Sequence, residues 1–229
     1  MKIRAFEMLQ RKYLSDNFLR LTIDKMNGKI QNLLKEAETS QDGKSSVASA
    51  EREFKSPEEA SEAFDSLRKK LYDINRWEAD SGVSAFQLFD ENGKGLETRQ
   101  AQKGNFVRIS LPGSGKYDWV RIVDIHDTSD EVVISVQPAR DPTEKESEKE
   151  TTSHFFTSDS RNNFCLQRQD AALAFYVIGL HEKPNVSESG GIIETVRNVA
   201  AANFGWLGFQ KIEWKTFCEN FLESEKVKE

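Results

Sequence analysis

The spacing of hydrophobic residues changes near residue 84, and this change constrains the fold more than any other feature of the chain. Before it, apolar residues recur every three or four positions, as they do on one face of a helix. After it, short apolar segments with a period of two are separated by turn-forming residues, which is typical of antiparallel strands. Helical spacing returns after Gly190 and Gly191. The sequence therefore predicts an α+β fold with helices at both ends of a sheet.

The segments after residue 84 have the composition of strands joined by short turns. Residues 90–93 and 112–115 are two of the turn-forming stretches between them. Because strands joined by short connections pair with each other, we expect an antiparallel sheet of about six or seven strands. One face of such a sheet must be buried, and the helices can cover it. The predicted strands are residues 85–89, 106–111, 118–125, 132–137, 154–157, 164–169 and 173–180.

A helix with a well-defined start precedes the strands. Ser56 can accept a hydrogen bond from the amides of the first turn, and Pro57 suits the first helical position. Glu59 follows Ser56 by three residues, as a capping box requires. The helix is expected to end at residues 81–82, just after Trp77. Its apolar stripe, which must lie on other apolar surface, comprises Ala60, Ala63, Phe64, Leu67, Leu71 and Ile74.

The order of these elements resembles the helix-grip arrangement of the START-like superfamily, which includes pollen-allergen lipid carriers and polyketide cyclases. The stretch SPEE at residues 56–59, followed by Phe64, Leu67 and Trp77, is similar to the segment in which such proteins follow their first strand with a helix. Here that first strand would be a short edge strand near residues 50–54. The resemblance implies a curved sheet that grips a long C-terminal helix, with an apolar cavity between them. It implies no catalytic residues, because the members share none.

Two segments precede the part of the chain that the resemblance covers. Residues 2–37 place apolar residues at steps of three and four, so we expect an amphipathic helical extension over residues 1–38. Two interpretations of its stripe remain open: it packs on the protein's own domain, or it binds a partner, including a second copy in a homo-oligomer. Residues 39–50 are rich in Ser and small polar residues and are expected to form a flexible linker. The α+β domain is then residues 51–223.

The C-terminal part of the chain has the pattern of a long helix or a broken pair of helices. Gly205 and Gly208 weaken the helical pattern, so we expect a bend there. Phe217 and Phe221 continue the apolar stripe beyond them. Trp206 is expected to lie either in the core at a helix contact or against a ligand.

Composition excludes several classes of function. The formal net charge is −6 and basic residues are mixed with acidic ones, which argues against a nucleic-acid-binding surface. No stretch has the roughly 20 apolar residues needed to cross a bilayer, and the N-terminus lacks the apolar core of a signal peptide. We therefore expect a cytoplasmic protein. Cys165 and Cys218 are far apart and are expected to be buried thiols.

Candidate site residues come from the strands and from the C-terminal helix. Arg121 on the expected inner face would need a buried carboxylate or the head group of an acidic ligand, unless it lies at the rim and reaches water. His154 opens a predicted strand and could lie at the mouth of a cavity. With Trp119 and Trp206, these residues form our predicted ligand-binding site. The larger and more apolar side of residues 117–125, which we expect to face the core, carries Tyr117, Trp119, Arg121, Val123 and Ile125.

The sequence contains no motif that identifies a reaction. The three His have no second His at a metal-binding spacing, and the stretch 111–118 lacks the residues of a phosphate-binding loop, so we expect neither a metal nor a cofactor. We expect a non-enzymatic protein that binds a small apolar or amphipathic molecule. Two alternatives remain: a cyclase- or hydrolase-type enzyme using His154 and Arg121, and an interaction protein that associates through residues 2–37.

Overall fold

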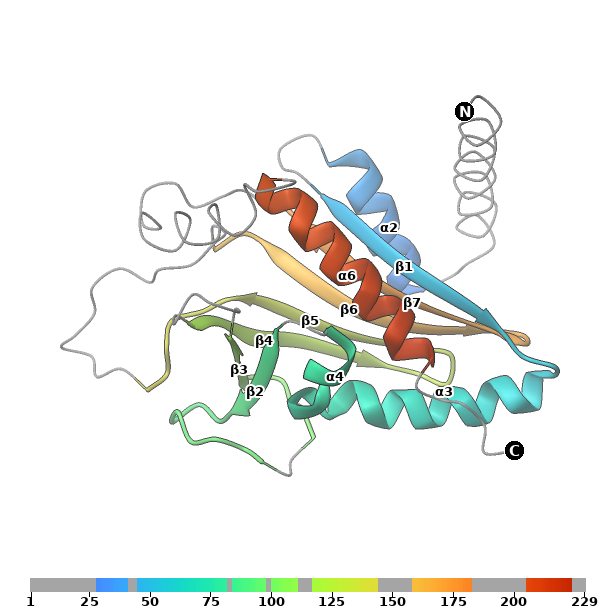
Figure 1. Cartoon of the computed structure of the whole chain (residues 1–229), viewed down its shortest axis with the longest axis horizontal. Helices are drawn as coiled ribbons and strands as arrows, with labels where there is room; N and C mark the ends of the chain where they lie inside the picture. The colour runs from blue at the N-terminus through green and yellow to red at the C-terminus, as the bar shows by residue number, and fades with distance from the viewer. Residues whose placement is uncertain are drawn as a thin grey trace.

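The computed structural model describes residues 28–40, 45–81, 84–97, 100–110, 117–143, 158–182 and 205–223, with only the backbone described for Glu78, Ser81 and residues 205–212. The described chain forms an α+β fold in which a curved antiparallel sheet packs on a C-terminal helix (Figure 1). Its strands are β1 (Ser46–Glu53), β2 (Ala85–Phe89), β3 (Phe106–Ser110), β4 (Tyr117–Asp127), β5 (Glu131–Pro138), β6 (Arg161–Gln169) and β7 (Ala172–Leu180).

The sheet contains seven strands in the order β1-β7-β6-β5-β4-β3-β2, and all neighbours are antiparallel. The meander from β2 to β7 therefore confirms the predicted antiparallel sheet. The predicted strand at residues 154–157 lies outside the described residues. Strand β1 lies at one edge of the sheet, beside β7. From there the chain passes through helix α3 (Pro57–Tyr72) to β2 at the opposite edge.

Helix α3 begins as predicted. Ser56 is extended, and its hydroxyl accepts a hydrogen bond from the Glu59 amide at 3.3 Å, with Pro57 in the first turn. The helix ends earlier than expected, at Tyr72, and is followed by a 3-10 turn (Ile74–Arg76) and the short helix α4 (Glu78–Ser81). The predicted stripe is buried against the sheet, so the helix covers the inner, concave face.

Helix α6 (Gly205–Glu223) lies across the same inner face (Figure 1). It begins at Gly205 and continues without interruption through Gly208, the two glycines at which the sequence predicted a bend. The rings of Phe217 and Phe221 are fully buried between the helix and the sheet. Cys218 is buried there as well, as expected.

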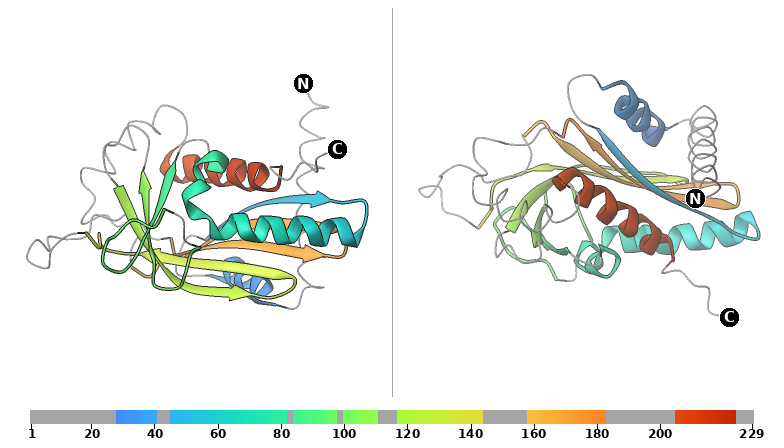
Figure 2. Two further views of the ribbon diagram at one scale, coloured as in Figure 1. Left: turned by 90° about the horizontal axis from the view of Figure 1, so that it is seen from below. Right: turned by 45° about the horizontal axis from the view of Figure 1, so that its top comes forward.

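Helix α2 (Lys29–Thr39) covers the opposite, outer face of the sheet. Figure 2 shows α2 and α6 on opposite sides of the strands. Ile30 and Leu34 of α2 are buried against Val133, Cys165 and Tyr176 of the sheet. For this part of the predicted N-terminal helix, the interpretation that the stripe packs on the protein's own domain is confirmed. Residues 2–27 of the predicted helix, and with them most of the proposed association surface, lie outside the described residues.

Strand β1 starts inside the segment that we expected to be a linker. Residues 46–50 pair with β7, from Ser46 opposite Gly179 to Ala50 opposite Phe175. The segment SVASAERE has few β-branched or aromatic residues, so its own propensity for a strand is low. Pairing with the apolar strand β7 determines its conformation.

Candidate functional site

Strand β4 presents its two faces the other way round from the sequence prediction. Val120 and Ile122 are buried in the inner core, whereas Trp119 and Arg121 lie on the outer face. A β-bulge shifts the register between Ile122 and Asp124, so strict alternation fails there. This bulge returns Ile125 to the inner core, so Ile125 does not share a face with Trp119 and Arg121 as strict alternation predicted.

The outer face of β2, β3 and β4 brings together arginine and aromatic side chains. Arg108 lies opposite Trp119 across the β3–β4 pair, and Phe106 lies opposite Arg121. On the other side of β3, Phe89 and Phe106 are cross-strand partners. We call this surface the Arg–aromatic face and define it as Phe89, Phe106, Arg108, Tyr117, Trp119 and Arg121.

The two arginines lie over aromatic rings. The Arg108 Cζ atom is 4.3 Å from the centre of the Tyr117 ring and 5.2 Å from that of Phe89. The Arg121 Cζ atom is 5.6 Å from the centre of the Phe106 ring. Each such contact attracts the cation to the ring by about 0.5–1 kcal/mol at exposed sites. The rings therefore fix the planes of both guanidinium groups on the sheet.

Trp119 and Phe89 form the floor of this face. Their rings meet edge to face with centroids 4.9 Å apart, and both side chains are buried although they belong to neither apolar cluster of the fold. The turn that follows β2 approaches the Pro142 backbone so closely that a β-carbon on Gly93 would lie 2.9 Å from the Pro142 carbonyl oxygen. Tyr117 remains 50% exposed at the rim.

The positive charge of this face is not neutralised within the described chain. Neither Arg108 nor Arg121 forms an ion pair with a carboxylate of the described residues. Arg121 Nε donates to the Gly104 carbonyl oxygen at 3.4 Å, and Arg108 Nη2 donates to Gln87 Oε1. The Arg108 Nε atom is buried and has no acceptor among the described residues. Such an unsatisfied donor on a cation is costly and calls for an explanation.

Of the four residues predicted to bind a ligand, the structure brings Trp119 and Arg121 together on this face. His154 lies outside the described residues, and Trp206 lies in the first turn of α6 without a described side chain. The alternation in FVRIS places Arg108 on the same side of β3 as Phe106. Gln87 and Phe89 were missed, although the alternation in AFQLF places them on one side of β2.

The inner face, where we expected a ligand cavity, is filled with aromatic rings over the described residues. The Phe217 ring lies 5.6 Å from that of Trp77 and 6.0 Å from that of Phe164, measured between centroids. Phe175 and Phe221 stack with centroids 4.1 Å apart. These distances are those of direct ring contacts. The part of the inner face beneath Phe217 and Phe221 is therefore a packed core.

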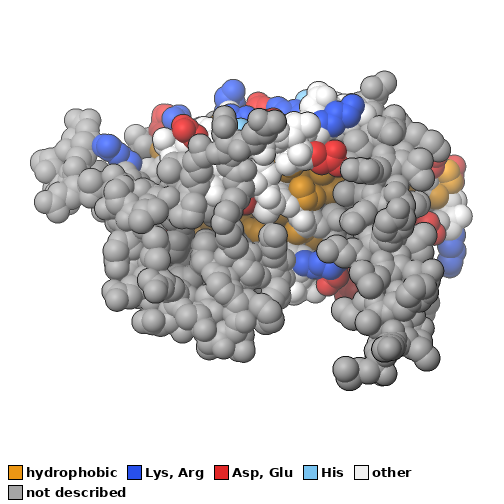
Figure 3. Space-filling view, turned by 90° about the horizontal axis from the view of Figure 1, so that it is seen from above, with side chains coloured by type: hydrophobic (Ala, Val, Ile, Leu, Met, Phe, Trp, Pro, Cys, Tyr) orange, Lys and Arg blue, Asp and Glu red, His pale blue; other side chains and the backbone are white. Residues whose placement is uncertain are grey.

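The remaining described surface is mixed in character. Only Val47 and Tyr117 among its large hydrophobic side chains are strongly exposed, at 42% and 50%. Figure 3 shows one face, on which the visible described side chains include hydrophobic ones and charged ones of both signs. No helix of the described chain is long and apolar enough to cross a membrane.

Comparison with known proteins establishes the fold. No family model matches the chain, and no curated protein matches it either. A hypothetical protein from Helicobacter pylori has a similar structure, with a TM-score of 0.50 and 9% sequence identity over 84% of this chain and 94% of that one. Two weaker likenesses are a protein from Mesorhizobium loti (TM-score 0.42, 11% identity, 80% of this chain and 100% of that one) and a major latex-like protein from Panax ginseng (TM-score 0.37, 12% identity, 79% and 97%).

Proposed function

We propose that the protein is a non-enzymatic binder of a small amphipathic anion, and that the Arg–aromatic face is its binding site. The observation that carries this proposal is the pair of arginines, Arg108 and Arg121, held on aromatic rings without a carboxylate partner in the described chain. They occupy diagonal positions of the β3–β4 pair, and the Cα atoms of such positions lie roughly 7–8 Å apart. Two like charges so placed repel each other, and an anion between them would remove the repulsion.

The chemistry of the face defines the class of ligand. A guanidinium group recognises a carboxylate or a similar planar oxyanion through paired hydrogen bonds, and Arg108 Nε is a buried donor without an acceptor in the described chain. The exposed ring of Tyr117 and the partly buried ring of Phe106 offer apolar surface to the rest of the molecule. With a net charge of −6, the whole chain repels extended polyanions, so a small anion fits better than a nucleic acid.

Calorimetric titration with decanoate and with decanol, both below their aggregation concentrations, tests the proposal. We expect decanoate to bind and decanol to bind at least about tenfold more weakly, because a charge-assisted hydrogen bond contributes about 1.5–3 kcal/mol. Arg108→Met should reduce decanoate affinity by about tenfold or more, since Met keeps much of the apolar contact and loses the charge.

Arg161→Met is the matched control, because Arg161 is an exposed arginine at the start of β6 with no ion pair to a described residue. It should leave decanoate binding unchanged. Circular dichroism should show the wild-type fold for both variants. Equal affinity for decanoate and decanol, or equal losses from the two substitutions, would show that this face does not recognise the anion.

A further inference from the structure

A second surface, separate from the Arg–aromatic face, lies at the other end of the sheet. It is a groove of about 280 Å³ on the outer face of β1, β7 and β6. Its floor includes Ala174 and the buried Tyr176, and its sides include Gln167 and Gln169 on β6 and Glu51, Arg52 and Glu53 on β1. The Arg52 guanidinium donates to the Leu222 carbonyl oxygen of α6 at 2.9 Å, on the inner side of the sheet. The groove is therefore apolar at its base and acidic along the β1 side.

The acidic side of the groove is electrostatically unfavourable as it stands. Burial raises the pKa of Glu51 above its ordinary value, and the neighbouring charge of Glu53 raises it further. Neither carboxylate forms an ion pair with a basic residue of the described chain. A basic group placed beside them would relieve both effects.

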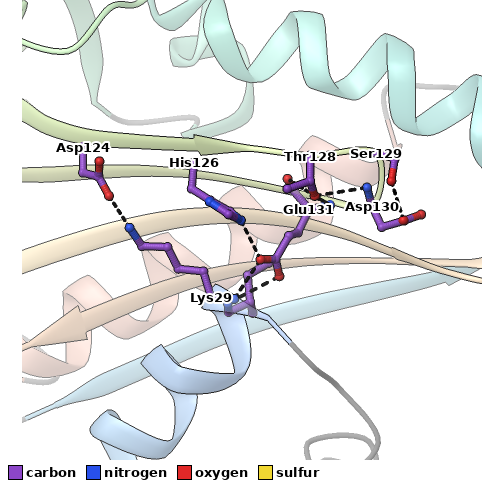
Figure 4. A network of polar contacts seen from close by, with 8 residues as sticks. Lys29, Asp124, His126, Thr128, Ser129, Asp130 and Glu131 are labelled. Atoms are coloured by element: carbon purple, nitrogen blue, oxygen red, sulfur yellow. Dashed lines mark hydrogen bonds and ion pairs between the residues drawn. The ribbon is translucent and has the colours of Figure 1, made fainter.

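The chain that precedes α2 leaves the described structure next to this groove. The Glu131 carboxylate accepts hydrogen bonds from the Lys29 amide at 2.7 Å and the Ile30 amide at 3.5 Å (Figure 4), which fixes the start of α2. Gly28 lies against the same carboxylate, since a β-carbon there would be 2.4 Å from a Glu131 oxygen. The start of α2 is thus held at the first residue of β5.

The strand register shows how short the path to the groove is. Glu131 pairs with Gln167, Gln167 pairs with Ala174, and Ala174 pairs with Glu51, so these four residues form one row across the sheet. Three strand spacings correspond to roughly 14 Å. About five extended residues span that distance. A chain leaving Gly28 along this row therefore brings residues 21–25 to the groove.

The sequence of residues 1–27 complements the groove in charge and in pattern. It contains six Lys and Arg residues and three Asp and Glu residues, a net charge of +3 in a chain of net charge −6. Leu21 and Ile23 are apolar, and Lys25 follows them with the same spacing of two. The residues that can reach the groove thus include both apolar and basic side chains.

We infer that residues 1–27 dock in this groove of their own chain, with Lys25 over Ala174, from where its long side chain reaches the Glu51 carboxylate, and with residues 21–23 farther along on the β1 side. The tether at Gly28 favours the same chain over a second copy, because a short linker raises the effective concentration to the order of millimolar. The docked segment would continue the cover that α2 gives to the outer face. This inference does not depend on the Arg–aromatic face.

Limited tryptic digestion of the full chain, followed by mass spectrometry, tests the docking. Docking protects the bonds after Arg20 and Lys25, so Glu51→Lys should make their cleavage at least about threefold faster. Ala174→Trp, which fills the groove, should have the same effect. The charge exchange Lys25→Glu with Glu51→Lys should restore protection at Arg20. Glu91→Lys is the control, because Glu91 lies in an exposed turn, and it should leave the rates unchanged.

Three results would overturn the inference. One is equal cleavage in Glu51→Lys, Ala174→Trp and the wild type. Another is an equal acceleration in Glu91→Lys, which would reflect charge alone. The third is protection that disappears on dilution, since it would mean that a second copy occupies the groove. Urea unfolding of each variant shows whether faster cleavage comes from the segment or from a destabilised fold.

Discussion

Asp118 is buried on the inner face of β4, where it lies opposite Ile109 of β3. Burial raises the pKa of its carboxyl to about 8, although a hydrogen bond with the backbone of Trp119 acts in the opposite direction. The native state therefore keeps a proton on this group at pH values where the unfolded chain, with a pKa of about 3.9, has lost it. This stabilisation is complete below the unfolded pKa and is lost as the pH rises toward 8.

We predict that Asp118→Asn makes stability less dependent on pH. Between pH 5 and pH 8, one proton held only by the native state changes the free energy of unfolding by up to roughly 1.4 kcal/mol per pH unit. Asn resembles the protonated carboxyl, so urea unfolding across this range should give a flatter profile for the variant. Burial also raises the pKa of Asp80 and Glu213, so some slope should remain.

The control for this prediction is Asp65→Asn on the exposed side of α3. It should keep the wild-type slope. A variant profile as steep as that of the wild type would show that Asp118 is ionised in the folded protein.

The same strand shows what residue types could and could not reveal. Tyr117, Trp119 and Arg121 were correctly assigned to one face of the strand from their alternation. The choice of face was wrong because it weighed apolar character and could not include the bulge after Ile122. A bulge adds one residue without any compositional signal in this strand.

At the scale of elements, the N-terminus of α2 depends on a residue from a distant strand. Gly28 provides no side-chain cap, and the helix has no acidic residue in its first turn. Glu131 supplies both the hydrogen-bond acceptor and the negative charge that this helix end lacks. Its carboxylate also contacts His126 Nε2 at 2.9 Å (Figure 4). Lys29 adds an ion pair with Asp124. The charge and the acceptor atoms that this helix end requires thus come from β4 and β5.

We predict that Glu131→Gln destabilises the protein by about 0.5–1 kcal/mol. Gln keeps an oxygen that can accept from the helix amides, but it loses the negative charge that interacts with the helix dipole and with His126. The loss should appear in urea unfolding at neutral pH. Hydrogen exchange should show it as faster exchange of the α2 amides.

The paired substitution for Glu131→Gln is Glu91→Gln, in an exposed turn, where we expect no change. If α2 exchanged at the wild-type rate in Glu131→Gln, the charge would not contribute to holding the helix.

Helices α3 and α2 differ in how far the sequence predicts them. The start of α3 is encoded locally by Ser56, Pro57 and Glu59, and it was predicted to the residue. The start of α2 relies on Glu131, about a hundred positions away, so the spacing of apolar residues around Gly28 could not locate it. The predicted strand near residues 50–54 missed the first residues of β1 (Ser46–Glu53) for a similar reason, because its partner β7 is distant in sequence.

At the scale of the whole molecule, the aromatic rings beneath α6 determine whether the fold is hollow. Phe217 lies at their centre, with ring centroids 5.6 to 6.4 Å from those of Trp77, Phe86, Phe164, Phe175, Trp214 and Phe221. The spacing of apolar residues along the sequence is the same whether their side chains fill a core or line a cavity. The sequence therefore predicted the sheet and the helix but could not predict that these rings contact each other.

We predict that Phe217→Ala lowers the free energy of unfolding by about 3–5 kcal/mol, the usual cost of removing a large ring from a packed core. Near-ultraviolet circular dichroism should weaken as well, because Trp77 and Trp214 lose a neighbour. Tyr117→Ala removes a ring that is 50% exposed and should cost much less. A loss below about 1 kcal/mol in Phe217→Ala would indicate that the space under α6 is loosely filled.

The pairing of β1 with β7 affects the order in which a growing polypeptide can acquire its structure. Ser46 lies opposite Gly179, and α2 rests on residues of β5, β6 and β7. During synthesis, the first two described elements must wait unpaired until residue 180 has emerged from the ribosome. Helix α2 and strand β1 are thus synthesised before the strands that hold them, and until those strands emerge their apolar residues can bind chaperones.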